Sequence, residues 1–229
     1  VSSSDLGRAE GAAEKIAAET GTRAVGLVGD LSDPANMDAL AREATDALGG
    51  EIDILFNNHG GPPLRTALEV SHTELSDQAD KMVLSLIKMT QLLVPGMVER
   101  KWGRVFMVGA SAVVEPIPNN VLSNMFRAAM AYYCKTLAGE VIKDGVTVNM
   151  VSPTTVLTGR TRSTAATFAE KKGITAQEEL AQRESRLPSG RFGKTREFGA
   201  MVAYLAGQDA AYCTGSNWRV DGGSVKSAI

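Results

Sequence analysis

The sequence is poor in the residues that usually bind metals or cross-link chains. It contains two cysteines and two histidines among 229 residues. Cys134 and Cys213 are far apart and form no C-x-x-C pair, so we expect the reduced thiols of a cytoplasmic protein and no disulfide. Since His59 and His72 have no cysteine pair nearby, we expect no metal site.

Excess charge of one sign and long apolar runs are also missing. A net charge of −2 does not favour nucleic acid or an anionic membrane as a partner. No run approaches the roughly 18 apolar residues of a transmembrane helix. The first residues, Val1 to Ser4, lack the basic and apolar regions of a signal peptide. Because no repeat or linker is visible, we expect residues 1–229 to form one domain.

Short apolar runs alternate with longer helical patterns along the chain. Val1 is interpreted as the end of a strand, and further strands are expected at 24–28, 52–56, 105–108, 146–151 and 217–220. Helices are expected at 7–20, from Pro34 to about 48, and at 73–101, 119–142 and 195–206. Residues 160–187 are charged and are expected to form an irregularly helical flap. Such alternation predicts βαβ units and a parallel sheet.

The segment 104–137 organises the chain. A buried strand is followed by Gly109, a loop that contains Ser111, and a long helix. We expect one apolar helix face, made of Val121, Met125, Ala129, Tyr133, Leu137 and Val141. A polar stripe has spacings of three and four, so its side chains can meet; it consists of Asn120, Ser123, Asn124 and Arg127. We expect this stripe at the carboxyl edge of the sheet, where open α/β sheets bind ligands.

Four further stretches resemble the short-chain dehydrogenase/reductase family. They are Gly29-Asp30-Leu31-Ser32, Asn57-Asn58-His59-Gly60, the run from Asn149 through Pro153 to Thr158, and the stretch from Gly190 to Gly223. The resemblance covers nearly the whole chain except its start. It implies a Rossmann-like doubly wound parallel α/β sheet in a single domain, with the first strand and helix missing.

The resemblance also implies cofactor-binding residues. Asp30 and Leu31 would meet the adenine, and Asn57, His59 and Gly60 would lie along the cofactor. Pro153, Val156 and Thr158 would clasp the nicotinamide side, with Thr154 where the family has Gly. His59 replaces the family's Ala; it either binds a phosphate or moves a proton, or it is a tolerated loop residue.

The family's catalytic residues are replaced. Alignment of RAAMAYYCKTLAGE places Ser123 at the catalytic Tyr and Arg127 at the catalytic Lys, while Met82 takes the place of the Asn. The family's Ser falls on Ala110, next to Ser111. The stretch EPIPNNVLSNMFRA resembles an atypical, ketoacyl-reductase-like branch that also lacks Tyr and Lys. The catalytic candidates are therefore Ser111, Ser123 and Arg127, of which the arginine can clamp an anion but cannot act as a base near pH 7.

The family's Gly-rich turn, T-G-x-x-x-G-x-G, occurs nowhere in the sequence. Since that turn holds the pyrophosphate, we expect the natural protein to be longer at its N-terminus. The full-length form would use NADP or NAD, whereas this chain would bind either one weakly or not at all. Ser2, Ser3 and Ser4 offer no carboxylate to a ribose, which favours NADP, although Asp5 is close by.

The function implied is an oxidoreductase acting on a small carbonyl or hydroxyl compound. Two alternatives remain open at this point. One is a non-redox enzyme on the same scaffold, a lyase or a relative of the halohydrin dehalogenases. The other is a non-catalytic binding or assembly protein that uses helix 119–142 as an oligomer face. A homodimer or homotetramer is expected in either case.

Overall fold

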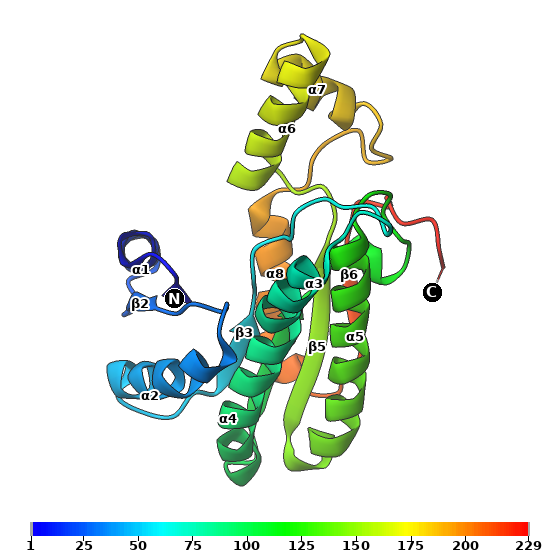
Figure 1. The fold of residues 1–229 in the computed structure, drawn as a ribbon. Coiled ribbons are helices and arrows are strands. Elements are labelled where there is room, and N and C mark those ends of the chain that lie inside the picture. Colours follow the sequence, from blue (N-terminus) through cyan, green and yellow to red (C-terminus); the bar gives the residue numbers. More distant parts are fainter. Residues whose placement is uncertain (1, 229) are drawn as a thin grey trace.

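The computed structural model describes residues 2–228, and its strands form two parallel sheets (Figure 1). The larger sheet has the order β3 (Ile54–Asn57), β4 (Gly103–Val108), β5 (Val146–Pro153) and β6 (Asn217–Val220). The smaller sheet pairs β1 (Ser2–Ser3) with β2 (Leu27–Val28). Every pair is parallel, which confirms the predicted α/β fold. Val1 lies outside the described residues.

Helices cover both faces of the larger sheet. On one face lie α5 (Val121–Val141) and a continuous helix made of α3 (His72–Ala79), a π-helical turn (Asp80–Leu84) and α4 (Ser85–Glu99). On the other face lies α8 (Thr195–Ala206). Along β4, Val105 and Met107 pack with α4 and α5, whereas Phe106 packs with α8. This alternation is that of a strand buried on both faces.

The continuous helix from His72 to Glu99 is long and apolar enough to cross a membrane by length and composition alone. It nevertheless carries Pro95 and a π-helical turn. Its side chains Leu86, Val94 and Met97 are buried in the core of the sheet layer. This packing is typical of a core helix, so the helix is weak evidence for a membrane span.

The smaller sheet carries its own helix and stands apart from β3 in Figure 1. Helix α1 (Leu6–Thr20) begins at the capping carboxylate of Asp5 and ends at Gly21, whose φ is 69°. Helix α2 (Met37–Leu48), preceded by a 3-10 turn at Pro34–Asn36, packs against α4 and joins the two parts. No ladder of hydrogen bonds connects β1 to β3 within the described residues.

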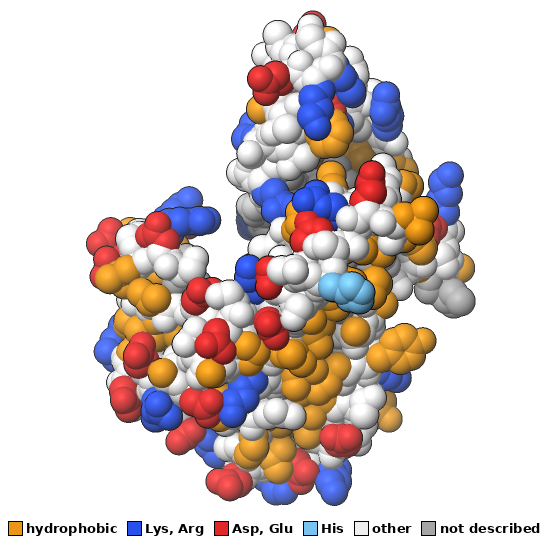
Figure 2. Space-filling view, in the orientation of Figure 1, with side chains coloured by type: hydrophobic (Ala, Val, Ile, Leu, Met, Phe, Trp, Pro, Cys, Tyr) orange, Lys and Arg blue, Asp and Glu red, His pale blue; other side chains and the backbone are white. Residues whose placement is uncertain are grey.

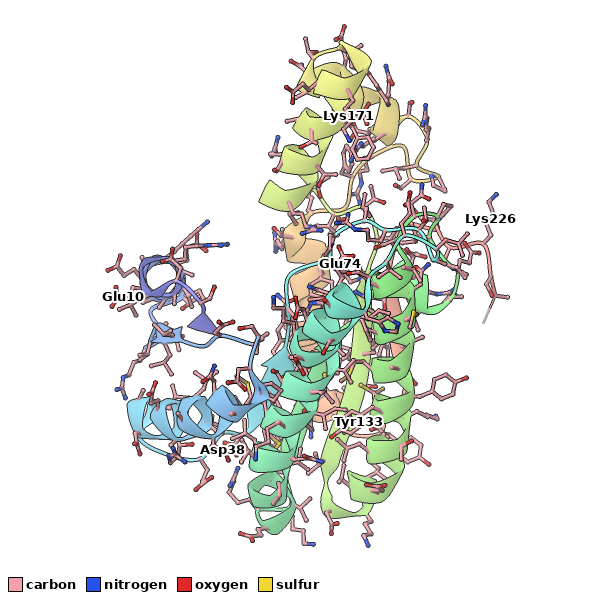
Figure 3. All side chains as sticks on the ribbon, viewed as in Figure 1. Glu10, Asp38, Glu74, Tyr133, Lys171 and Lys226 are labelled. Carbon is pink, nitrogen blue, oxygen red and sulfur yellow. The ribbon has the colours of Figure 1, made fainter. Side chains whose placement is uncertain are left out.

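The predicted flap is regular, so the expected irregularity is wrong. It consists of α6 (Gly159–Lys172) and α7 (Ala176–Glu184), which project above the sheet in Figure 1 and carry Lys171 in Figure 3. Thr175 and Glu178 form a reciprocal capping box that starts α7. The buried carboxylate of Glu179 accepts hydrogen bonds from Lys172 and Arg183 and so holds the two helices together.

The apolar face predicted for α5 is offset from the buried one. The residues buried against the sheet are Leu122, Met130, Cys134, Ala138 and Val141. Met125, in the predicted stripe, is 48% exposed. Tyr133, labelled in Figure 3, is only half-buried and packs at the margin of the core. Because nearly every side of α5 is apolar, periodicity alone could not identify the inward face.

Candidate active site

Three strands of the larger sheet end at the same edge. The register pairs Asn57 of β3 with Met107 of β4, and Val108 of β4 with Val151 of β5. Chain segments that leave these strands therefore meet beyond Asn57, Val108 and Pro153. A 3-10 turn at Ser111–Val113 follows β4 and packs against α5.

Arg127 reaches this edge from α5. It is 8% exposed, and its Nη1 donates a hydrogen bond to the carbonyl oxygen of Val108. Its Nε is buried and has no hydrogen-bond partner. Burial, and secondarily the charge of Arg160, lower the pKa of the guanidinium to about 10. Burial and a neighbouring positive charge thus both disfavour the charged form of Arg127.

Ser123 precedes Arg127 by one helical turn on α5 and is also buried. Its hydroxyl makes no hydrogen bond within residues 2–228; the hydrogen bonds nearby are those of Asn124 and Arg127. Residues four apart on a helix are neighbours, so Ser123 and Arg127 lie on the same side of α5, and a direct contact between hydroxyl and guanidinium stays a prediction. Asn124 is not part of that pair, because its side chain bonds the backbone of Ile117 twice.

Ser111 begins the 3-10 turn after β4, and its carbonyl oxygen accepts hydrogen bonds from Val114 and Glu115. Gly109, two residues earlier, is required by packing: a Cβ there would lie 2.1 Å from Ser152 Oγ. The backbone of β4 therefore runs close to β5 as it enters the loop. Ser111 lies on the same turn-and-helix unit as Ser123, but no hydrogen bond joins the two serines.

Arg160 adds a second guanidinium, which the sequence analysis did not single out. It lies in the first turn of α6, and its Nη2 is 3.5 Å from the carbonyl oxygen of Pro62. A Cβ on Gly61 would lie 2.7 Å from that Nη2. The absence of a side chain at Gly61 leaves the space that Arg160 fills. Only the Gly60-Gly61 pair could have hinted at such an approach from the sequence.

His59 lies in the loop after β3, where the positive charges of both Arg127 and Arg160 act on it. Its Nδ1 donates to the carbonyl oxygen of Gly60. Its pKa is lowered to about 4, first by burial, and further by the charges of Arg127 and Arg160. The imidazole is therefore neutral at pH 7, and without a positive charge it is a poor ligand for phosphate.

A cavity of about 650 Å³ opens between this edge and the smaller sheet. The predicted residues Asp30, Leu31, His59 and Gly60 line it together. Asp30 accepts a hydrogen bond from Ser32 N, and hydrogen bonds from Ser32 lower its pKa. The remaining lining residues are Ser4, Arg8, Gly29, Ser32, Asn58, Gly61, Gln78 and Lys81.

Asn57 does not line this cavity; its neighbour Asn58 does. The Asn57 side chain is buried and donates to Thr90 Oγ1 at 3.0 Å, which ties β3 to α4. The sequence prediction that this segment steadies the sheet matches that bond. A direct cofactor contact by Asn57 stays a prediction.

Pro153 is the last residue of β5, and Val156 and Thr158 lie on the connection from β5 to α6; none of the three lines the 650 Å³ cavity. Thr158 is the N-cap of α6, and its Oγ1 accepts from Thr161 N. Val156 pairs with Gly193 in an isolated bridge. The positive φ of this connection, 52°, falls on Thr155, one residue beyond the position where the sequence analysis places the family's Gly. The main effect of this connection is to bring Arg160 over Gly61.

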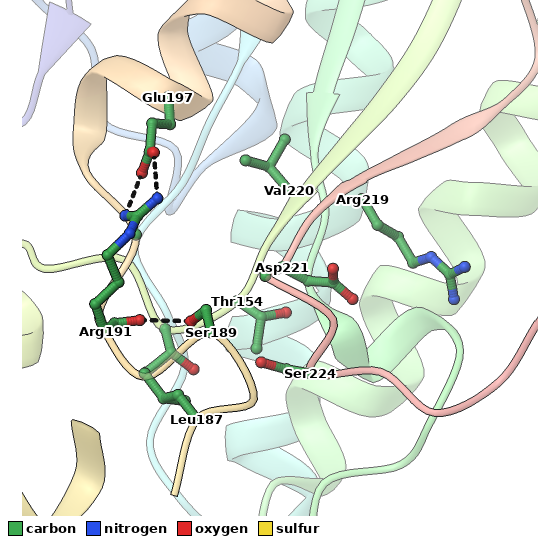
Figure 4. Close-up of a pocket in the computed structure, with 12 residues that line it drawn as sticks. Thr154, Leu187, Ser189, Arg191, Glu197, Arg219, Val220, Asp221 and Ser224 are labelled. Carbon is green, nitrogen blue, oxygen red and sulfur yellow. Dashed lines mark hydrogen bonds and ion pairs between the residues drawn. The ribbon is translucent and has the colours of Figure 1, made fainter. Parts of the chain in front are cut away.

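A second cavity of about 260 Å³ lies beneath the flap, at the ends of β5 and β6 (Figure 4). Its charged groups are already paired, whereas Thr154 Oγ1 is buried and has no hydrogen-bond partner in the part of the chain that the structure describes. Arg191 forms two hydrogen bonds with Glu197, and Ser189 donates to the Arg191 carbonyl oxygen. Asp221 accepts from the backbone of Gly223 and Val225. This cavity is therefore a weaker candidate for chemistry than the edge that carries Arg127.

Comparison with known proteins finds matches over nearly the whole chain. Residues 1–225 match the family model described as enoyl-(acyl carrier protein) reductase. A 3-oxoacyl-[acyl-carrier-protein] reductase of Escherichia coli is 31% identical over 216 residues, which are 93% of this chain and 83% of the relative. A 2,3-dihydroxy-2,3-dihydro-p-cumate dehydrogenase of Pseudomonas putida is 32% identical over 213 residues, covering 93% of this chain and 78% of that protein.

Among solved structures, L-sorbose reductase of Gluconobacter frateurii, in complex with NADPH and L-sorbose, superposes with a TM-score of 0.91. It is 28% identical, and the match covers 97% of this chain and 85% of the other. The NADPH-dependent reductase YwfH of bacilysin biosynthesis superposes with a TM-score of 0.90 at 25% identity, covering 99% and 87%.

Proposed function

The chain belongs to the short-chain dehydrogenase/reductase family, and from that membership we propose that it is an NAD(P)-dependent oxidoreductase that interconverts a carbonyl and an alcohol. In this proposal Ser123 and Arg127 hold the reacting oxygen. One observation carries it: both side chains are buried, one helical turn apart, at the carboxyl end of β4. Ser111 is proposed as a third contact to the substrate, from the turn that packs on the same helix.

The described residues fit the two ends of a nicotinamide cofactor better than its middle. Asp30, Leu31, His59 and Gly60 all line the 650 Å³ cavity; Asp30 and Leu31 are proposed to meet the adenine, and His59 and Gly60 to lie along the cofactor. Pro153, Val156 and Thr158 are proposed to approach the nicotinamide from the β5–α6 connection. Between the two ends, residues 2–228 contain no Gly-rich strand-to-helix turn of the kind that holds a pyrophosphate.

When bound, the nicotinamide would supply or accept the hydride. The chain's own contribution is electrostatic. Arg127 places a desolvated positive charge beside the oxygen, where it stabilises the negative charge that develops as the carbonyl is reduced. Ser123 Oγ donates a hydrogen bond to the same oxygen and orients it. Arg127 keeps its proton near pH 7, because its lowered pKa is still about 10, so the proton comes from water.

NADP is the proposed form of the cofactor. Ser4 and Arg8 line the cavity beside the end of β1, where a ribose 2′-substituent would lie. The carboxylate of Asp5 is committed elsewhere, since it caps α1 by accepting from Arg8 N at 3.0 Å. The Arg8 guanidinium has no ion pair among the described residues, and the Asp5 carboxylate already accepts a backbone hydrogen bond. This combination favours a phosphate over a hydroxyl at this place.

We also infer that a further parallel strand, followed by its Gly-rich turn, completes the sheet between β1 and β3. Within residues 2–228, all ladder hydrogen bonds of β3 go to β4, so no described strand pairs with its other edge. Ile54 and Phe56 on that strand are 47% and 41% exposed. A mainly apolar cavity of about 470 Å³ adjoins them, lined in part by Leu27, Leu40 and Leu55. An N-terminal extension of the chain is the proposed source of that strand.

The test is reduction of a panel of small aldehydes and ketones, followed by the loss of NADPH absorbance. It is made with this chain and with a form extended at its N-terminus by a Gly-rich βα unit. The extended form is expected to bind NADPH at least tenfold more tightly and to reduce a member of the panel. Ser123→Ala in that form is expected to lower kcat about a hundredfold. Turnover without nicotinamide, or binding without turnover, would contradict the proposal.

A further inference from the structure

The edge that carries Arg127 holds two cations and no counter-ion. Neither Arg127 nor Arg160 forms an ion pair with any carboxylate in the range 2–228. Arg100 is paired with Glu51 and Asp53, and Arg191 with Glu197. The buried Arg104 also lacks an ion pair within the described residues, but it bonds three backbone carbonyls, whereas Arg127 bonds one. Since buried charges are normally paired or well hydrogen-bonded, the poorly bonded Arg127 needs a reason.

Most hydrogen-bond donors of the two arginines are unused. Arg127 uses only Nη1, for the carbonyl oxygen of Val108, and its buried Nε has no partner. Arg160 makes a single long contact, 3.5 Å from Nη2 to Pro62 O. The Ser123 hydroxyl beside Arg127 is also without a hydrogen bond within the described part of the chain. The cluster thus has many donors and few acceptors.

The two guanidiniums reach this place from different elements and at some cost. Arg127 comes from α5 and Arg160 from the first turn of α6, and their charges are close enough to oppose each other. Neutral His59 lies next to both and lines the 650 Å³ cavity. Charges of one sign gathered beside a cleft attract ligands of the opposite sign. The group that would relieve the repulsion is an anion beside His59 in the cavity.

We propose that Arg127 and Arg160 together bind the carboxylate of the substrate, and that the substrate class is small oxo acids or hydroxy acids. A planar carboxylate can accept two parallel hydrogen bonds from one guanidinium. It would lie between α5 and α6, and the flap would thereby contribute to specificity. This inference rests on the proposed function only in that the carboxylate belongs to the compound that is oxidised or reduced.

One other oxyanion could satisfy the same donors, namely a phosphate of the nucleotide. The position of Ser123 argues for the substrate, because Ser123 and Arg127 are proposed to hold the reacting oxygen. In a 2-oxo acid that oxygen is next to the carboxylate, so Arg127 can contact both groups while Arg160 contacts the carboxylate alone. The test therefore compares a carboxylate with a phosphate directly and uses no nicotinamide.

The probes are pyruvate, its neutral amide pyruvamide, and inorganic pyrophosphate. Binding is followed by NMR through the imidazole signals of His59, with exposed His72, the only other histidine in the sequence, as the internal reference. Pyruvate is expected to bind at least tenfold more tightly than pyruvamide. Arg160→Gln is expected to remove that preference, whereas Arg162→Gln, the loss of an exposed charge on the same helix, is expected to keep it.

Three results would overturn the inference: equal binding of pyruvate and pyruvamide, an unchanged preference in Arg160→Gln, or binding of pyrophosphate but not of pyruvate. Failure of the proposed function is seen in a different experiment. If neutral ketones are reduced while pyruvate does not bind, the anion site is wrong and the reductase stands. If pyruvate binds through Arg160 but no carbonyl compound is ever reduced, the anion site stands and the reductase is wrong.

Discussion

Arg127 on α5 donates a hydrogen bond to the carbonyl oxygen of Val108, the last residue of β4. This bond fixes the guanidinium across the gap between helix and strand end, one turn after Ser123. A carbonyl at the end of a strand needs a hydrogen-bond donor from outside the ladder. Here Arg127 supplies the donor for the Val108 carbonyl, and the carbonyl supplies the acceptor for Arg127. The cation is thereby held in place although its burial is unfavourable.

Arg127→Met is expected to separate stability from activity. The substitution removes a buried charge whose pKa is lowered to about 10 by burial, but it leaves the Val108 carbonyl without a partner, at a cost of about 1–3 kcal/mol. The two effects have opposite signs and similar size. In the N-terminally extended form we therefore expect a melting temperature within a few degrees of the parent, measured by calorimetry, and at least a hundredfold loss of carbonyl reduction.

The control for this variant is Arg104→Met. Arg104 is also buried, but it stacks on the Trp102 ring at 4.6 Å and bonds the backbone carbonyls of Gly103, Gly145 and Gly207, away from the cavity. It is expected to lose stability while the active fraction keeps its rate. A clear drop in the melting temperature of Arg127→Met, with activity retained in the folded fraction, would mean that Arg127 is only structural.

His59 is expected to make the folded state sensitive to mild acid. Its pKa is lowered from 6.5 to about 4 in the folded chain, first because it is buried. As the pH falls from 6.5 to 4, the unfolded chain takes up a proton that the folded chain does not, so stability is lost over this window. The gap corresponds to about 3 kcal/mol.

The measurement is urea unfolding at several pH values for the parent, for His59→Gln and for His72→Gln. Other groups also titrate in this window, so the informative quantity is the difference between parent and variant. His59→Gln is expected to flatten the pH dependence between 6.5 and 4. His72 is exposed, so its variant is expected to follow the parent, and equal curves for all three proteins would be evidence against a neutral, buried His59.

The sequence predicts the parallel sheet and the places of its strands, but not the inward face of the main helix. Helix 195–206 and strand 217–220 have their predicted bounds, because each is one short apolar or amphipathic pattern between clear turn residues. The strand predicted at 24–28 is paired only at Leu27–Val28. Its neighbour β1 has just two paired residues, which limits the length of the ladder.

Arg160 shows what sequence reasoning could not reach. It is one of several charged residues in a polar segment, and only the fold brings it over Gly61, 99 positions earlier in the chain. By contrast, Ser123 and Arg127 were predicted as neighbours because helical spacing is a local property. Contacts within one element can be predicted from spacing, whereas contacts between a flap and a distant loop depend on the whole topology.

Arg8 is expected to determine the choice between NADPH and NADH. It is exposed, lines the cavity near the end of β1 and has no ion pair among the described residues. Arg8→Ala in the N-terminally extended form is expected to raise the KM for NADPH about tenfold, because one guanidinium–phosphate contact is lost. The KM for NADH is expected to stay unchanged.

Arg23→Ala is the matched control for Arg8, since Arg23 is exposed on the same small layer but outside the cavity. It is expected to leave both KM values as they are. If Arg8→Ala changes the KM for the two cofactors by the same factor, Arg8 does not contact a 2′-phosphate.

Tyr132 is expected to lie in an interface between copies of the chain. It is 79% exposed on α5, seven positions after the half-exposed Met125, so both project from one side of the helix. Figure 2 shows a broad apolar surface over α4 and α5, larger than the scattered apolar atoms of an ordinary surface. We propose a homodimer or homotetramer that buries this surface.

Tyr132→Asp places a charge in this apolar surface, and light scattering after size exclusion is expected to show a smaller assembly. Leu68→Asp, at a 99% exposed loop position away from α5, is expected to keep the parent mass. An unchanged mass for Tyr132→Asp would assign the apolar surface of α5 to some other role.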